Sequence, residues 1–229
     1  MGKGLNAALL FTIGDFQVTL TVATTWGIMV LLGFLSWVAT RRKWDATHQG
    51  VLQTIAEGIV TSMEDAIADA APQHARQLLP FIATLWIYLV VANLVGLVPG
   101  LESPTRDLSQ TSALAVLVFF SVHWFGIRSQ GLKNYLRHYL MPSPFLLPFH
   151  LISEATRTIA LAIRLFGNMM SLGMAAMLVL VVAGFLAPVP LLILHVIEAL
   201  VQAYIFGMLA LIYVAGGMQS QELRRQRDD

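Results

Sequence analysis

Five stretches of this sequence lack aspartate, glutamate, lysine and arginine, and each is about 20 residues or longer, the length of a helix that crosses a bilayer core. They cover residues 16–40, 77–101, 108–127, 165–197 and 199–221. Across the chain 57% of the residues are hydrophobic and 12% are charged, whereas an ordinary soluble domain carries about 25% charged residues. A buried soluble core would not need five such stretches. The sequence therefore predicts an all-α, polytopic protein that lies in the lipid bilayer.

The distribution of basic residues orients the predicted spans. Clusters of lysine and arginine follow the first and third spans, at 41–43 and 128–137, and a third cluster occupies the tail at 224–227. Cytoplasmic loops are enriched in these residues, so we place all three clusters in the cytoplasm. The loop at 102–107 has balanced charges and suits the outside. The two final helices, separated at 187–190, cross the membrane twice and so return the chain to the cytoplasm. The charges of all loops then fit an N-terminus outside and a C-terminus in the cytoplasm.

We predict one membrane domain, 1–229, built from helical elements of different kinds. They are a first span at 16–40, a surface amphipathic helix at 50–71, a helical pair at 77–99 and 108–127, and a hairpin of two long helices at 150–186 and 191–220. The first hairpin helix has about 37 residues, or about 55 Å at 1.5 Å per residue. Because a hydrocarbon core is only about 30 Å thick, we expect this hairpin to be steeply tilted.

The segment at 50–71 differs from a membrane span in its pattern. Apolar residues recur at every fourth position from Val51 to Ile67, while the acidic residues lie largely elsewhere, as in an amphipathic helix. Its acidity argues against binding to anionic lipid and slightly favours a protein partner. The alternative is a solvated connector.

The two hairpin helices each carry a polar stripe. On the first, a helical wheel places six residues within about 100°: Ser153, Glu154, Arg157, Arg164, Asn168 and Ser171. On the second, His195, Glu198 and Gln202 share an arc of about 60°, with Tyr213 in line. These residues are either bundle contacts or functional groups. Both interpretations stay open for Asn168 and Gln202.

Arg164 is the group that favours function, because an arginine at the centre of a span costs at least about 2.5–3.5 kcal/mol. It cannot relay protons, since arginine keeps its proton at every physiological pH, but it favours the ionised form of a nearby carboxylate. That carboxylate is Glu154 or Glu198 in a closed ion pair, or it belongs to a partner subunit.

Small residues help to decide whether the carboxylate belongs to this chain or to a partner subunit, because they recur at every fourth position on both helices. Gly167, Ser171 and Ala175 form one row, and Ala199, Ala203 and Gly207 form the other. Such rows let helices approach closely in membranes. Here they pack the hairpin on itself or form a seam for another helix near Arg164.

Several classes of function find no support in the sequence. The chain has no cysteine, so thiolate metal sites and disulfides are excluded. His195 and Glu198 suit a proton relay better than a metal site, because no HExxH motif or second Glu-His pair accompanies them. No phosphate-binding loop is present, and the net charge of +1 gives no sign of a nucleic-acid partner. We expect no cofactor, no metal and no nucleotide chemistry in this chain.

Three motifs carry a close resemblance to a known family. They are WIYLVVANLVGLVP at 86–99, RLFGNM at 164–169 and HVIEALVQAYIF at 195–206. Together they resemble subunit a of the F-type ATP synthases, of the bacterial kind, and the resemblance extends over nearly the whole chain. It implies the fold described above, a location in the bacterial inner membrane, and a complex with a ring of c subunits, peripheral-stalk b subunits and the remaining ATP synthase subunits.

The resemblance also implies roles for individual residues. The essential arginine of the family corresponds to Arg164, which would face the carboxylates of the c ring between two aqueous half-channels. The last-helix polar residues correspond to His195 and Gln202, with Glu198 on the same stripe, and the motif asparagines to Asn168 and Asn93. Glu154 completes the expected ion pathway.

One position departs from the family pattern. Many relatives have an ionisable residue five positions after the motif asparagine, where this chain has Gly173, so the outer half-channel would depend more on His195 and Glu198. The implied function is translocation of H⁺ or Na⁺ coupled to ring rotation, and thereby to ATP synthesis or hydrolysis in other subunits. The alternatives are a transporter or channel that works without a rotor, and a membrane scaffold.

Overall fold

The computed structural model describes most of the chain, namely residues 9–13, 16–41, 51–98, 101, 103–132, 147–184 and 189–219. Over these residues it forms six α-helices, one 3-10 turn and a two-stranded hairpin. Five of the helices are long and apolar enough to cross a membrane. The predicted all-α polytopic fold class is therefore confirmed, with a small β-hairpin added at the start.

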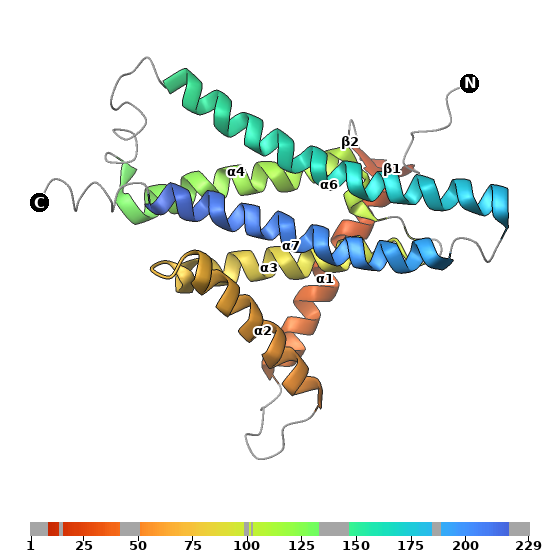
Figure 1. The fold of residues 1–229 in the computed structure, drawn as a ribbon, viewed down its shortest axis with the longest axis horizontal. Coiled ribbons are helices and arrows are strands. Elements are labelled where there is room, and N and C mark those ends of the chain that lie inside the picture. The colour runs from red at the N-terminus through yellow and green to blue at the C-terminus, as the bar shows by residue number, and fades with distance from the viewer. Residues whose placement is uncertain are drawn as a thin grey trace, which may run out of the picture.

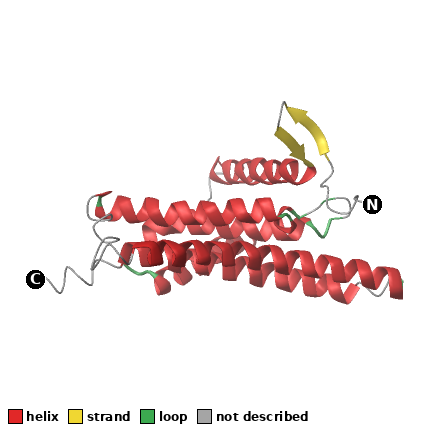
Figure 2. Ribbon diagram, turned by 90° about the horizontal axis from the view of Figure 1, so that it is seen from above, coloured by secondary structure: helices red, strands yellow, loops and turns green. Residues whose placement is uncertain are grey.

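The β-hairpin replaces the beginning of the predicted first span. Strands β1 (Leu9–Ile13) and β2 (Phe16–Thr19) pair antiparallel, and helix α1 (Leu20–Arg41) follows directly (Figure 2). The helix thus starts four residues later than the predicted start at 16. The reason is local, because aromatic and β-branched residues such as Phe16 fit a strand as well as an apolar helix.

Helices α2 (Val51–Ala70) and α3 (Ala75–Val95) form a bent pair (Figure 1). Helix α2 buries Ile67 completely near its end, where it packs on α3, while Ile59 remains 50% exposed. The apolar stripe of α2 therefore packs on the bundle near its C-terminal end, while Ile59, further from that end, is open.

Four helices make up the main bundle, and α7 lies at its centre. The 3-10 turn η1 (Pro104–Arg106) connects α3 to α4 (Leu108–Gln130). Helix α7 (Val189–Gln219) packs against α3, α4 and α6 (Leu147–Ala183) (Figure 1). Small residues of α7 let its neighbours approach closely, and larger side chains fill the space between them. The fully buried residues include Leu78, Ile82, Leu89, Leu165, Phe206, Leu211 and Val214.

The hairpin of α6 and α7 is the longest feature of the molecule. Helix α6 has 37 residues and α7 has 31, so α6 is about 55 Å long. Its C-terminal part extends well beyond the start of α4 (Figure 1). There Val181 and Val182 are 84% and 85% exposed. Such apolar surface requires lipid or another protein as its environment.

Candidate functional site

Arg164 lies in the middle of α6 with its side chain exposed. Beside it on the open surface lie Ile163, which is 56% exposed, and Gly167, which is also exposed. In the described part of the chain no carboxylate forms an ion pair with Arg164. The closed pair with Glu154 or Glu198, one of the two alternatives open from the sequence, is thus not formed.

One turn further along α6, the two polar stripes of the hairpin meet. The Asn168 amide nitrogen, Nδ2, donates a hydrogen bond to Oε1 of Gln202 on α7, at 2.7 Å. Gln202 is 2% exposed, and its own Nε2 is buried with no hydrogen-bond partner in the described chain. The contact holds α6 and α7 in a fixed relation and leaves one amide donor for a further group.

Asn93 of α3 is the centre of a buried hydrogen-bond chain that joins three elements. Its Nδ2 donates to the carbonyl oxygen of Ala199 on α7 at 3.0 Å, and its Oδ1 accepts from Thr105 Oγ1 at 2.8 Å. Thr105 contacts Ser103 Oγ at 2.7 Å, and Ser103 donates to the carbonyl oxygen of Ala92 at 2.8 Å. The turn η1 is therefore fastened to α3 and α7 through side chains that the membrane interior would otherwise leave unsatisfied.

His195 lies beside Asn93, with the backbone of Asn93 next to its ring. It is 4% exposed, and its Nε2 is buried without a hydrogen-bond partner among the described residues. Glu198, one turn later, is partly exposed and pairs with no described cation. We refer to Asn93, Asn168, His195 and Gln202 as the α7 polar cluster.

Glu154 does not belong to that cluster, although the sequence placed Glu154 and Asn168 on the same polar stripe. It lies 14 residues before Asn168, which is about 21 Å along the helix. Its Oε2 is instead 3.8 Å from Nε2 of His123 on α4. The guanidinium carbon of Arg157 lies 5.4 Å from the ring centroid of Tyr213 on α7.

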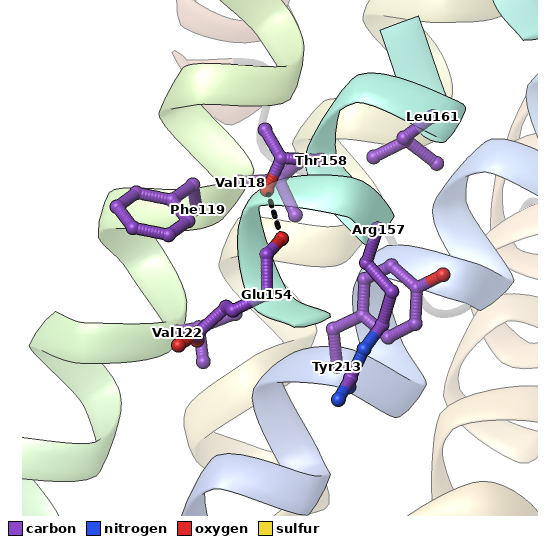
Figure 3. Close-up of a pocket in the computed structure, with 8 residues that line it drawn as sticks. All are labelled: Val118, Phe119, Val122, Glu154, Arg157, Thr158, Leu161 and Tyr213. Carbon is purple, nitrogen blue, oxygen red and sulfur yellow. Dashed lines mark hydrogen bonds between the residues drawn. The ribbon is translucent and has the colours of Figure 1, made fainter. Parts of the chain in front are cut away.

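These four residues form what we call the α4 polar cluster: His123, Glu154, Arg157 and Tyr213. Three of them line a small cavity of about 20 Å³ between α4, α6 and α7 (Figure 3), which is room for about one water molecule. The other lining residues are Val118, Phe119, Val122, Thr158 and Leu161. The described residues contain no group of three or more acidic, histidine or cysteine side chains that could hold a metal ion.

Three residues in or beside these clusters were not singled out from the sequence: His123 of the α4 polar cluster, Thr105, which is bonded to Asn93, and a third beside the α7 polar cluster. His123 sits alone in an apolar span, and Thr105 lies in a loop, so neither has a spacing that marks it. The third is Arg106, which the sequence assigned only to an exposed loop of balanced charge. In the structure its guanidinium lies against Gly173, where a Cβ atom would be 2.6 Å from its central carbon. The space over Gly173 is thus filled from η1.

The two rows of small residues have different environments. On α7, Ala199 and Ala203 are fully buried, and a Cβ atom at Gly207 would collide with the indole of Trp86 on α3. On α6, Gly167 and Ser171 are exposed, and nothing lies within 4 Å of a Cβ built at Gly167. The α7 row packs inside the chain, and the α6 row is open beside Arg164.

Comparisons with known proteins identify the family. The family model described as ATP synthase A chain matches residues 22–215. ATP synthase subunit a of Legionella pneumophila strain Philadelphia 1 is 54% identical, over 98% of this chain and 97% of the relative. ATP synthase subunit a 1 of Hahella chejuensis is 61% identical, over 96% of this chain and 92% of the relative. Subunit a 2 of Pelobacter propionicus is 60% identical, over 94% of each chain. These matches confirm the resemblance found in the sequence, and the chain belongs to the ATP synthase A chain family.

Proposed function

We propose that this chain is the ion-translocating stator subunit of the ATP synthase membrane sector. It provides two half-channels, and Arg164 is an electrostatic gate between them at the interface with a ring of c subunits. Ion flow through the half-channels turns the ring, and rotation couples to ATP synthesis or hydrolysis in other subunits. The chain itself carries out no nucleotide chemistry.

The position of Arg164 is the observation that carries this proposal. Its guanidinium is permanently charged and lies on an apolar helix surface without a carboxylate from the described chain. A cation in hydrocarbon is costly unless an anion or water faces it. The open row at Gly167 and Ser171 lets another helix come close at the same place. A partner helix with an ionisable carboxylate fits both features.

The mechanism follows from electrostatics. An ion from one half-channel neutralises a ring carboxylate, which then turns through lipid at low cost. After nearly a full rotation the carboxylate reaches the other half-channel and releases its ion. The positive field of Arg164 favours the ionised carboxylate and prevents a neutral one from passing directly between the half-channels. Each elementary charge that crosses 100 mV supplies about 2.3 kcal/mol.

The two polar clusters are candidates for the two half-channels. The α7 polar cluster, with Glu198 beside it, is bonded to η1 through Asn93. The α4 polar cluster lies near the start of α6 and the end of α7, toward the opposite end of the bundle. Arg164 lies between them along α6. We assign the first cluster to the outer half-channel and the second to the inner one. This assignment follows from an N-terminus outside and a C-terminus in the cytoplasm of a bacterial inner membrane.

A transporter that works without a rotor is the alternative function, and it has less support. Such a protein must neutralise Arg164 within its own fold, with a carboxylate that the described chain does not bring to it. The proposed assembly instead takes that carboxylate from the c ring. Peripheral-stalk b subunits and the rest of the ATP synthase are the other expected partners.

The test is ATP-driven ion pumping in inverted membrane vesicles that contain the whole complex. Arg164→Ala is expected to abolish pumping of either H⁺ or Na⁺ while the complex still assembles. Arg128→Ala is the matched control, because it removes an exposed arginine at the end of α4. Pumping by Arg164→Ala at the rate of the control would refute the gate.

A further inference from the structure

The turn η1 is held in place by small, close contacts on two sides. Ser103, Pro104 and Thr105 are all buried, and the first and third are bonded to each other and to α3. A Cβ atom at Gly96, at the end of α3, would lie 2.9 Å from Cβ of Ser103. The backbone that carries Arg106 is therefore rigidly placed against α3.

The side chain of Arg106 extends from this platform to α6. Its guanidinium carbon and one terminal nitrogen would both lie 2.6 Å from a Cβ atom at Gly173, and its Nε 2.9 Å. A side chain at position 173 would therefore push the guanidinium of Arg106 away from this place. Glycine at this position leaves room for a planar guanidinium against the bare helix backbone.

The guanidinium is also close to the α7 polar cluster. It acts electrostatically on His195, whose Nε2 is buried and has no hydrogen-bond partner in the described chain. An arginine keeps its charge at every physiological pH. A fixed positive charge thus lies at the η1 end of the cluster. It is on the side of α6 opposite to Arg164, because a step of nine residues from position 164 to 173 turns the helix by about half a revolution beyond two full turns.

We infer that Arg106 is a positioning residue of the ion pathway, whose contribution is a fixed positive charge over Gly173 and beside His195. This inference depends on the proposed function, since it concerns the same pathway. Conduction requires that a cation is held weakly enough to leave. The buried oxygens of Asn93, Thr105 and Ser103 would favour a trapped cation, and the charge of Arg106 opposes it.

The effect of the Arg106 charge can be distinguished from the effect of its packing by supplying a cation from position 173, on the α6 side of the contact. Arg106→Met removes the charge and keeps a side chain of similar length, and is expected to lower ATP-driven pumping about tenfold, as loss of a nearby charge at the protein interior would. Arg106→Ala is expected to do the same. In the Arg106→Ala background, Gly173→Lys returns a cation to the vacated space from α6, and Gly173→Met fills it without charge.

The expected result is that Lys at position 173 restores most of the lost pumping and Met does not, with assembled complex measured in each case. Gly173→Ala alone is expected to lower pumping because it displaces the guanidinium, and to have no further effect once Arg106 is alanine, which tests the contact itself. Pumping at the wild-type rate by Arg106→Met overturns the inference. So do equal recovery with Lys and Met, recovery with neither, or failure of Arg106→Met to assemble, because each makes Arg106 a packing residue.

Arg164→Ala, measured in the same vesicles, distinguishes failure of this inference from failure of the proposed function. If Arg164→Ala pumps normally, the gate itself is refuted. If Arg164→Ala is inactive while Arg106→Met pumps at the wild-type rate, only the inference about Arg106 is refuted.

Discussion

Two arginines on one face of α6 have different surroundings, although two helical turns separate them. Arg157 is exposed as a residue, but its guanidinium carbon lies 5.4 Å from the centroid of the Tyr213 ring in the α4 polar cluster. Arg164 lies on exposed apolar surface. The guanidinium of Arg157 therefore has an aromatic partner within the chain, whereas that of Arg164 has no carboxylate partner among the described residues.

The Asn168–Gln202 hydrogen bond predicts coupling between the two residues. Asn168→Ala and Gln202→Ala should each slow pumping, and the double variant should be little worse than the more impaired single variant. Hydrogen bonds between membrane helices contribute about 0.6 kcal/mol on average and up to about 1.7. A double-mutant cycle on the pumping rate measures this coupling. Pairing Asn168→Ala with Thr84→Ala, a change at an exposed position on α3, should be additive, and additivity for Gln202 as well would contradict the prediction.

The buried hydrogen bonds of Asn93 predict that replacing this residue lowers the stability of the protein. Asn93→Ala leaves the Thr105 hydroxyl without its acceptor and removes a donor from the Ala199 carbonyl, at a cost of about 1–3 kcal/mol for each unsatisfied buried group. The assembled complex should lose its pumping activity at a lower temperature than the wild type. Thr84→Val serves as the control, because the Thr84 hydroxyl is exposed and bonds only within its own helix. An unchanged inactivation temperature for Asn93→Ala would show that the chain of bonds adds no stability.

Helical periodicity was sufficient to predict some residue contacts and not others. It placed Asn168 and Gln202 on polar stripes of adjacent helices, and these stripes meet. It also placed Glu154 on the first stripe. Glu154 and Asn168 are about 21 Å apart along the helix, however, so Glu154 contacts α4 while Asn168 contacts α7. Arg106 had no periodic signal at all, because a loop residue acquires its contacts only when the turn is fixed in space.

At the scale of helices, the bundle uses one row of small residues and leaves the other open. The α7 row is closed by α3, with the Trp86 indole against Gly207 and its Nε1 donating to the Tyr204 carbonyl oxygen at 3.3 Å. The α6 row has no such cover at Gly167. Of the two interpretations from the sequence, packing of the hairpin on itself does not describe the α7 row, which packs on α3. The open α6 row leaves room for another helix, and the seam stays a prediction.

Leucine substitutions in the two rows should affect different properties. Gly207→Leu collides with Trp86 and should prevent the chain from accumulating as a protease-resistant species in the membrane. Gly167→Leu meets open space, so the chain should accumulate normally, while pumping falls because the bulky side chain blocks the approach of a c-subunit helix. Immunoblots of protease-treated membranes and pumping assays measure the two effects. Normal pumping by Gly167→Leu would contradict the proposed seam, and Trp86→Leu should partly rescue Gly207→Leu.

The helices themselves follow closely from the sequence, and the start of the chain does not. The hairpin helices begin and end within three residues of the expected positions, because apolar runs and prolines mark their ends. The strands at 9–19 were missed, since strand and helix are hard to distinguish in a short apolar segment that contains aromatic and β-branched residues.

At the scale of the whole molecule, the helix ends fall into two groups. The η1 turn and the start of α4 lie toward one end of the bundle, with the end of α6 and the start of α7. The starts of α3 and α6 lie toward the other end, with the end of α7 (Figure 1). This arrangement agrees with the orientation that the basic residues predict.

Cysteine labelling tests the orientation directly, because the chain contains no cysteine of its own. Ser109 and Ser129 are both exposed and lie near opposite ends of α4. A membrane-impermeant maleimide should label Ser109→Cys from outside the cell and Ser129→Cys only in inverted vesicles. Labelling both in permeabilised membranes controls for reactivity. The reverse pattern would invert the topology and exchange the two half-channels.

The sparse cover of α6 has a consequence for the life of the protein in the cell. In its most apolar window only 11% of the residues are buried within the chain, compared with 39% for α3. An unassembled copy would thus present a long, poorly anchored helix to the proteases that remove orphan membrane proteins, and degradation follows the population of such open states. The cellular amount of this subunit would then be set by the supply of its partners, which would keep its stoichiometry correct without control of its synthesis.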